Sequence, residues 1–274
     1  MPIPKVSAPH LRAKGSVPQI FWTTLLALVP AVLVFLFLKG FSSFRILTVS
    51  TASALLSEMG AEKFLGKRPS LYNGSALLSA FLFALFIPPD LASWKAALGA
   101  AFGIIFGKQI FGGLGQNPFN PSLVGCAFIF TLSSHPSVFF RESAGAAQST
   151  VLAGMIFAGG LVLIFKRIIR WEVPLLYWGG YVLFCFALGD EAGQSVFSWP
   201  LLAAAFFIVT DPVTTPVTRL GGQWFALGAG IGSAFFSKST NLFQGITSAV
   251  LLMNALSPWL DTQFRPAGAK RIRG

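Results

Sequence analysis

The chain alternates between long runs of apolar residues and short segments rich in Gly, Pro, Lys and Arg. A helix needs about 20 mostly apolar residues to cross the hydrocarbon core of a bilayer. Ten runs reach or approach that length, and the pattern predicts an all-α integral membrane protein with about ten transmembrane helices. The predicted helices lie at residues 19–38, 43–60, 73–89, 92–107, 118–133, 150–165, 173–189, 195–210, 223–237 and 242–260.

The positions of the basic residues predict how these helices are oriented. If the amino terminus is cytoplasmic, 15 of the 20 Lys and Arg residues fall in segments on the cytoplasmic side. Cytoplasmic loops of membrane proteins carry this kind of excess of positive charge. The sequence therefore predicts a multi-pass membrane protein with both termini in the cytoplasm.

Composition excludes several classes of protein. With 54% apolar and 11% charged residues, the chain has too little polar surface for a soluble domain and too little charge for a disordered one. The net charge of +11 falls in short clusters between apolar runs, which disfavours nucleic-acid binding. Two Cys and two His residues leave no disulfide framework, zinc knuckle or metal cluster, and no complete active site is recognisable in this chain alone.

Two sequence matches predict an internal repeat. Residues 86–90 (FIPPD) end the third run, and residues 207–212 (FIVTDP) end the eighth run 121 positions later. Asn117 opens the fifth run and Asn241 opens the tenth, 124 positions later. Because five is an odd number of helices, the second copy would enter the membrane from the opposite side, as in transporters with inverted repeats. The expected organisation is a cytoplasmic lead-in (1–18), a first five-helix repeat (19–133), an outward loop (134–149), a second repeat (150–260) and a basic tail (261–274).

The segment at residues 107–121 (GKQIFGGLGQNPFNP) interrupts otherwise apolar sequence with glycines, prolines and amide side chains. Non-helical backbone at membrane depth must be covered by protein or line a cavity, and glycine lets backbone approach a ligand closely. We expect Asn117 to cap the following half-helix, with Pro118 at its first position and free N–H groups facing a ligand. An ordinary interfacial loop is the alternative. The candidate binding residues are Gly112, Gly113, Gln116, Asn117, Phe119 and Asn120.

A second polar segment ends the eighth run. Asp211, Thr214 and Thr215 can bind a cation or a ligand hydroxyl there, or they can simply stop the helix by satisfying backbone groups. Asp90 occupies the equivalent place in the first repeat. These four residues are the candidates for an ion route.

Two further polar residues can be interpreted either as functional groups or as purely structural ones. Asn73 opens the third run in an Asn-Gly-Ser sequence that is typical of a helix cap, and it is also a candidate binding residue. Lys108 lies inside the glycine-rich segment. It either pairs with an acidic residue or extends its ammonium group to the membrane surface.

In combination these motifs resemble the RnfD/NqrB family, which comprises the membrane protein RnfD of the Rnf electron-transport complex and NqrB of the sodium-translocating NADH:quinone reductase. The glycine-rich segment is the most specific match, and the segments follow in family order over nearly the whole chain. A long amino-terminal extension is typical of NqrB, and its absence favours the Rnf side. The matching segments are residues 7–12 (SAPHLR), 73–78 (NGSALL), 107–109 (GKQ), 111–121 (FGGLGQNPFNP), 210–213 (TDPV) and 251–256 (LLMNAL).

The resemblance implies a urea-transporter-like fold in a bacterial cytoplasmic (inner) membrane. It implies a redox protein within a larger complex that moves electrons between ferredoxin and NAD, coupled to translocation of Na⁺ or H⁺. It also implies an FMN bound to a threonine through a phosphoester, and a riboflavin held without a covalent bond. The alternatives are an NqrB-like part of a quinone reductase, a non-redox transporter or channel of the same fold, and a scaffold for the other proteins of a complex.

The FMN attachment site of the family corresponds here to residues 142–153 (ESAGAAQSTVLA). In the family the threonine ends a Ser/Thr-Gly-Ala-Thr run just before the sixth span. One register places Thr150 at the attachment position. Another register places Ala147 there, which has no hydroxyl group. Thr150 is therefore the candidate for covalent FMN, and flavin held without a bond is the alternative.

Overall fold

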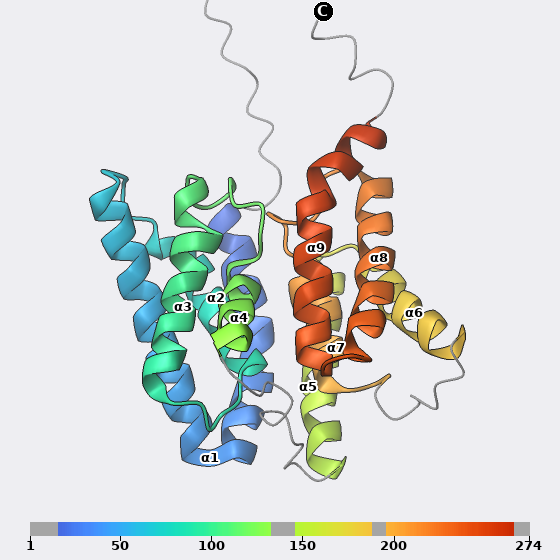
Figure 1. Cartoon of the computed structure of the whole chain (residues 1–274), viewed down its shortest axis with the longest axis horizontal. Helices are drawn as coiled ribbons and strands as arrows, with labels where there is room; N and C mark the ends of the chain where they lie inside the picture. Colours follow the sequence, from blue (N-terminus) through green and yellow to red (C-terminus); the bar gives the residue numbers. More distant parts are fainter. Residues whose placement is uncertain (1–15, 133–145, 188–195, 266–274) are drawn as a thin grey trace, which may run out of the picture.

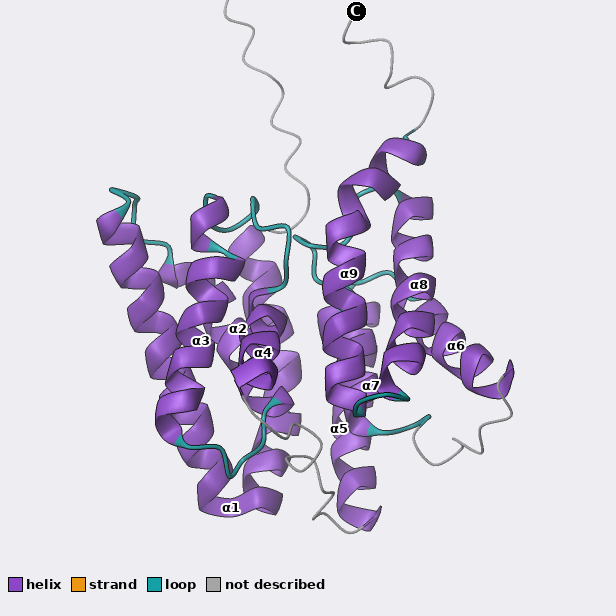
Figure 2. Ribbon diagram, viewed as in Figure 1, coloured by secondary structure: helices purple, strands orange, loops and turns teal. Residues whose placement is uncertain are grey.

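The computed structural model describes residues 16–132, 146–187 and 196–265, and the regular structure in these ranges is entirely helical (Figures 1 and 2). The predicted motif at residues 7–12, residues 134–145 of the predicted outward loop and the tail beyond residue 265 lie outside the described residues. The elements are α1 (Val17–Phe64), η1 (Leu71–Asn73), α2 (Ser75–Phe86), α3 (Ser93–Gly107), η2 (Gln109–Phe111), α4 (Pro121–Leu132), α5 (Ala146–Phe165), α6 (Glu172–Ala187), α7 (Trp199–Ala203), η5 (Ala204–Ile208), α8 (Arg219–Ser237) and α9 (Leu242–Gln263).

Helix α1 contains the first two predicted spans. Its backbone leaves helical geometry at Gly40 (φ 64°, ψ −146°), a conformation that glycine adopts more readily than other residues. The chain reverses its direction at Gly40. As a result, Tyr72, beyond the end of α1, lies beside Trp22 near its start, and the indole N–H of Trp22 donates to the carbonyl of Tyr72 at 2.9 Å. Each half of α1 exceeds 20 residues, and by length and composition α1 can cross a membrane.

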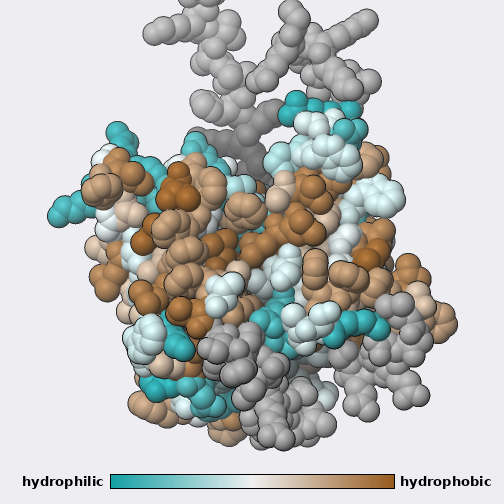
Figure 3. All heavy atoms as spheres, viewed as in Figure 1, coloured by the Kyte–Doolittle hydropathy of each residue, from teal (hydrophilic) through white to brown (hydrophobic). Residues whose placement is uncertain are grey.

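Apolar residues form a broad band across the face of the molecule drawn in Figure 3, with hydrophilic residues above and below it. Five shorter apolar helices accompany α1 in the described part of the chain. An exposed apolar band like the one in Figure 3 is typical of a protein whose middle faces the hydrocarbon of a membrane. The five are Ser75–Phe86, Pro121–Leu132, Ser149–Phe165, Glu172–Ala187 and Trp199–Ile208.

The helices form two halves that lie side by side (Figure 1). In the first half, α3 packs against α1 and α4; in the second, α8 packs against α6 and α9. The halves meet where α1 packs on α5 and α4 packs on α9. Short central helices lie inside each half: α2 in the first, and α7 continued by the π-helix η5 in the second, with every residue from Trp199 to Ile208 buried.

An aromatic cluster joins the two halves at their core. Trp199 of α7 lies with its ring centroid 6.2 Å from that of Phe35, 6.5 Å from that of Phe86 and 5.3 Å from that of Phe243. These residues come from α1, α2, α7 and α9. Aromatic pairs at such distances add to the stabilisation from apolar burial, so the cluster helps to hold the two halves together.

Close packing of α3 on α4 depends on Gly103. A Cβ atom at this position would lie 2.3 Å from the carbonyl oxygen of Pro121, the first residue of α4. Because the colliding atom belongs to the backbone, no change of side-chain rotamer relieves the contact. The position of α4, and of Asn120 directly before it, therefore depends on glycine here.

We expect Gly103→Ala to lower the free energy of unfolding by about 1–3 kcal/mol, the usual cost of overpacking. The control is Gly60→Ala, because a Cβ at Gly60 meets nothing within 4 Å and alanine is the better helix former. Thermal unfolding of the detergent-solubilised protein measures both effects. Equal midpoints for the two variants would contradict the packing described here.

Candidate functional site

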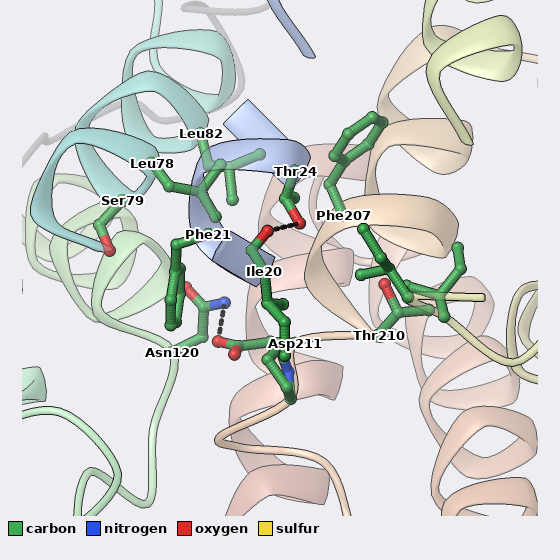
Figure 4. A pocket seen from close by; sticks show the side chains of 13 residues that line it. Ile20, Phe21, Thr24, Leu78, Ser79, Leu82, Asn120, Phe207, Thr210 and Asp211 are labelled. Atoms are coloured by element: carbon green, nitrogen blue, oxygen red, sulfur yellow. Dashed lines mark hydrogen bonds between the residues drawn. The ribbon is translucent and has the colours of Figure 1, made fainter. Parts of the chain in front are cut away.

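The two halves are joined by a hydrogen bond between two of the predicted site residues. The Nδ2 group of Asn120, directly before α4, donates to Oδ2 of Asp211 at 3.1 Å, although the residues are 91 positions apart (Figure 4). Oδ1 of Asn120 accepts from the backbone N–H of Ser122 at 3.1 Å, and Oδ1 of Asp211 accepts from that of Val213 at 3.0 Å. Each side chain is thus fixed by its own local turn and presents its remaining polar atom to the other half.

The predicted helix cap was three residues too early. Helix α4 begins at Pro121 rather than Pro118, and Asn120 rather than Asn117 binds the first turn. The sequence contains Asn-Pro twice, and both copies satisfy the preference for Asn at the cap and Pro at the first helical position. Asn117 donates to the carbonyl of Phe119 at 3.2 Å, while its buried Oδ1 has no partner in the described part of the chain.

A small cavity of about 30 Å³ adjoins the Asn120–Asp211 contact, which is room for a water molecule. Figure 4 shows both side chains pointing toward each other, with Phe21 of the first half beside Asn120. The lining residues are Ile20, Phe21, Thr24, Leu78, Ser79, Leu82, Asn120, Ile168, Ile169, Phe207, Thr210, Asp211 and Pro212.

A larger cavity of about 230 Å³ lies beside the first and shares Asp211 with it. Its polar groups come from Arg170, Thr210, Asp211 and Thr215, and its apolar wall comes from the loop between α5 and α6 and the loop before α8. The lining residues are Ile168, Ile169, Arg170, Val173, Thr210, Asp211, Pro212, Thr215, Pro216, Val217 and Gly222.

The loop that follows η5 fixes Asp211 at this junction. Burial raises the pKa of the Asp211 carboxyl to about 6, while its hydrogen bonds and the charge of Lys108 act to lower it. Thr215 binds the loop to itself, because its hydroxyl donates to the carbonyl of Val209 at 2.7 Å. Thr214 is buried, and its carbonyl accepts from the hydroxyl of Ser257 on α9 at 2.9 Å.

The remaining candidates of the glycine-rich segment lie away from Asp211. Gly112 and Gly113 have φ values of 120° and 102°, and a Cβ at Gly112 would overlap the side-chain oxygen of Gln116. Gln116 is exposed, and the ring of Phe119 packs near that of Phe111, at 6.1 Å between centroids. These residues shape the loop, and of this segment Asn120 is the residue that lines the smaller cavity.

A second polar cluster lies in the first half around Lys108. Its ammonium group forms a buried ion pair with Glu58 of α1 and donates to the hydroxyl of Ser75 at 2.6 Å. Lys108 is 1% exposed and Glu58 is fully buried. Oδ1 of Asn73 accepts from both the N–H and the hydroxyl of Ser75, at 2.8 and 2.6 Å. Gly74 is the N-cap residue of α2, and Asn73, directly before it, binds the first residue of that helix. Lys108 takes the pairing alternative rather than extending to the surface.

This cluster continues toward the end of α1. The hydroxyl of Ser70 contacts the carboxylate of Glu62, and the Ser70 N–H donates to the same carboxylate at 3.0 Å. Gln109 donates from Nε2 to Glu58 at 3.4 Å, and its main-chain carbonyl accepts from Lys67 at 3.2 Å. Buried charges are costly unless they are paired and hydrogen-bonded. Glu58 is paired with Lys108 and Glu62 is hydrogen-bonded by Ser70, whereas Oε2 of Glu58 has no hydrogen-bond partner in the described part of the chain.

Sequence reasoning missed Glu58 and Glu62. Both lie on the carboxyl-terminal half of α1, Glu58 within the predicted span at residues 43–60. An ionisable residue inside a predicted span indicates a functional or paired group, and this signal was present in the sequence.

Thr150 lies far from both clusters. It is exposed in the first turns of α5, whereas Ile168 and Ile169, which line the cavities, follow the other end of that helix. The 15 helical steps from Thr150 to Phe165 span about 22 Å at the usual rise per residue. The structure therefore separates the candidate attachment residue from the Asn120–Asp211 site.

Known proteins resemble this chain over almost its whole length. A family model described as NQR2, RnfD, RnfE matches residues 5–143 and 131–270. The D subunit of the proton-translocating ferredoxin:NAD(+) oxidoreductase complex of Clostridium ljungdahlii is 29% identical, over 95% of this chain and 94% of the relative. The D subunit of the ion-translocating oxidoreductase complex of Methanosarcina acetivorans is 29% identical, over 94% of each chain. The D subunit of the Na(+)-translocating ferredoxin:NAD(+) oxidoreductase complex of Acetobacterium woodii is 27% identical, over 97% of this chain and 96% of the relative. The chain therefore belongs to the NQR2, RnfD, RnfE family.

Proposed function

We propose that this chain is the flavin-carrying membrane subunit of an Rnf-type ferredoxin:NAD oxidoreductase complex that couples electron transfer to translocation of Na⁺ or H⁺. Family membership and the names of the three relatives support the assignment to such a complex. The observation that carries the electron-transfer part is the Asn120–Asp211 contact between the halves, beside the larger cavity of the second half that Asp211 also lines. Its partners are then the other subunits of the complex, membrane lipid and the coupling ion.

The proposed architecture is ten transmembrane helices in two inverted five-helix repeats, urea-transporter-like, in a bacterial inner membrane. The α3–α4 pair and the α8–α9 pair occupy corresponding places, and the short α2 and α7–η5 end at the two repeated motifs. Asn241 caps α9 by accepting from the N–H of Gln244 at 3.0 Å, as Asn120 caps α4. The excess of basic residues on one side supports cytoplasmic termini.

The residues around the larger cavity fit the ring system of a flavin in kind. The pyrimidine edge of a flavin presents two carbonyl oxygens and one N–H, which need donors and an acceptor. Arg170 offers donors, Asp211 offers an acceptor, and Ile169 and Val173 are apolar. A cavity of about 230 Å³ is below the ~300–1,000 Å³ of typical ligand sites, so the ring rather than the whole molecule is the part enclosed.

We therefore assign riboflavin or the ring of an FMN to this cavity, held without a covalent bond. When bound, flavin supplies the electron-transfer chemistry. The chain's own residues position the ring, exclude water and set the local charge. Asn120, which lines the adjoining smaller cavity, would add a polar contact, whereas Asn117, a candidate by its sequence, lines neither of the two cavities. Asp211, Thr214 and Thr215 also remain the candidates for the ion route, whereas Asp90 lies exposed.

A second flavin, FMN, is proposed at Thr150. Its place in the first turns of α5 keeps it at the end of the bundle opposite the cavities, on the outward side according to the distribution of basic residues. The chain would then hold two flavins separated by the aromatic and aliphatic core. Such a core excludes water and side reactions between them.

Thr150→Ala is expected to abolish covalently bound flavin. The measurement is flavin fluorescence of this chain in a denaturing gel, after purification of the complex from its native host. Ser149→Ala is the matched control, because it removes the neighbouring hydroxyl and should leave the fluorescent band. A fluorescent band of undiminished intensity in Thr150→Ala would contradict this attachment site. If the wild-type protein band shows no fluorescence, flavin held without a covalent bond is favoured instead.

A further inference from the structure

The loop between η5 and α8 forms one wall of the larger cavity, with Pro216 and Val217 among the lining residues. The last turns of α9 hold this loop at two points. The hydroxyl of Ser257 donates to the carbonyl of Thr214 at 2.9 Å, and the carboxylate of Asp261 binds the end of the loop. Because Ser257 and Asp261 are four positions apart, both lie on the same face of α9.

Asp261 binds the loop with both of its carboxylate oxygens. Oδ2 accepts from the backbone N–H of Val217 at 3.0 Å. Oδ1 accepts from the backbone N–H of Thr218 at 2.9 Å and from the Thr218 hydroxyl at 2.8 Å. Thr218 is the N-cap residue of α8, so the negative charge lies at the end of that helix where the helix dipole favours it. Asp261 therefore makes two separable contacts: one caps α8 through Thr218, and the other fixes Val217 in the cavity wall.

The carbonyl of Val217 in turn holds the side chain of Arg170. Nη2 of Arg170 donates to this carbonyl at 3.2 Å. Nη1 of Arg170 lies beside Gly222, since it would be 3.8 Å from a Cβ atom at that position. Arg170, Val217 and Gly222 all line the larger cavity. Arg170 is exposed, and an exposed arginine samples many rotamers unless it is bound, so the Val217 carbonyl places its guanidinium group at the cavity wall.

We propose that Asp261 is a positioning residue for the ligand of the larger cavity: it holds Val217, and Val217 holds the Arg170 guanidinium that contacts the ligand. The inference rests on the proposed function, which assigns a flavin ring to this cavity. A guanidinium group is planar, with several N–H donors, so its orientation decides which carbonyl oxygens of the ring it reaches. A side chain that is already fixed loses less conformational entropy when the ligand binds, so these contacts raise the affinity.

Asp261→Asn tests the proposal, because it separates the two contacts of Asp261. The remaining side-chain oxygen can still accept from Thr218, whereas an NH₂ group replaces the acceptor of the Val217 N–H. Thr218→Val is the matched control: it removes the hydroxyl that donates to Asp261 and leaves the Val217 contact in place. We expect riboflavin to bind roughly 2- to 10-fold more weakly to Asp261→Asn, the usual cost of immobilising one side chain, and normally to Thr218→Val.

A double-variant cycle with Arg170→Met separates positioning from a general loosening of the fold. Riboflavin is titrated into the full-length, detergent-solubilised chain after dialysis against flavin-free buffer, and binding is followed by quenching of the flavin fluorescence. If Asp261 acts through Arg170, its substitution has no further effect once Arg170 is replaced, and D261N/R170M binds riboflavin as Arg170→Met does. A loosened fold would instead weaken binding by the same factor in both backgrounds.

The same titrations distinguish a failure of this inference from a failure of the proposed function. A wild-type chain that neither carries nor binds riboflavin overturns the proposed function and this inference with it. When wild type binds riboflavin, three results overturn this inference alone: unchanged affinity in Asp261→Asn, equal losses in Asp261→Asn and Thr218→Val, or a loss that persists without Arg170. Where Asp261→Asn does not fold, Arg170→Met decides, because Arg170 is exposed and unchanged affinity in that variant also overturns the inference.

Discussion

Lys108→Met is expected to lower the free energy of unfolding by about 3–5 kcal/mol, because it leaves the fully buried carboxylate of Glu58 without its counter-ion. The measurement is thermal unfolding of the detergent-solubilised chain, followed by tryptophan fluorescence. Lys63→Met is the matched control. Lys63 is exposed in the last turn of α1, where substitutions usually change stability by less than about 0.5 kcal/mol.

A double variant separates loss of the pair from loss of one partner. Replacing a whole buried ion pair by apolar residues of similar size is often neutral or stabilising. E58M/K108M is therefore expected to recover most of the stability that Lys108→Met loses. A double variant as unstable as the single one would show that the cost comes from packing around Lys108 rather than from the unpaired charge.

Asp211→Ala is expected to weaken binding of the non-covalent flavin roughly 10- to 100-fold, since hydrogen bonds to charged groups contribute about 1.5–3 kcal/mol. The substitution also leaves the Nδ2 group of Asn120 without the acceptor that it has across the interface. Flavin released by acid from the purified chain, per mole of protein, measures the loss.

Asp90→Asn is the control for this experiment. Asp90 occupies the corresponding place in the sequence repeat but is exposed, so flavin content should stay at the wild-type value. Equal losses in Asp211→Ala and Asp90→Asn would contradict the placement of the flavin beside Asp211. Retention of flavin in both would place it elsewhere in the molecule.

The helices were predictable because each apolar run is long enough to be identified by itself. All ten predicted ranges overlap a helical segment of the described chain. The join between the first two was not predictable as a single kinked helix, because Gly40 interrupts helical geometry at one residue while the hydrogen-bonded pattern continues on both sides. The π-helix η5 differs from an α-helix mainly in its hydrogen bonding. The spacing of apolar residues does not report that bonding, so the π-helix could not be predicted from the sequence.

The candidate site was predictable in part. Asn120 and Asp211 both stand out as polar residues in apolar surroundings, but their contact spans 91 positions and depends on how the two halves dock. The roles of Asn117 and Asn120 could not be separated, because each precedes a proline. Glu58 and Lys108 are 50 positions apart, and only the packing of α1 against the α3–α4 connection brings them together.

The most direct test of the account is the flavin content of this chain within the complex purified from its native host. Acid should release flavin from the wild-type chain but not from Asp211→Ala, and the wild-type chain should also show the fluorescent band that depends on Thr150. A complex that oxidises ferredoxin and reduces NAD while this chain carries no flavin of either kind would contradict it.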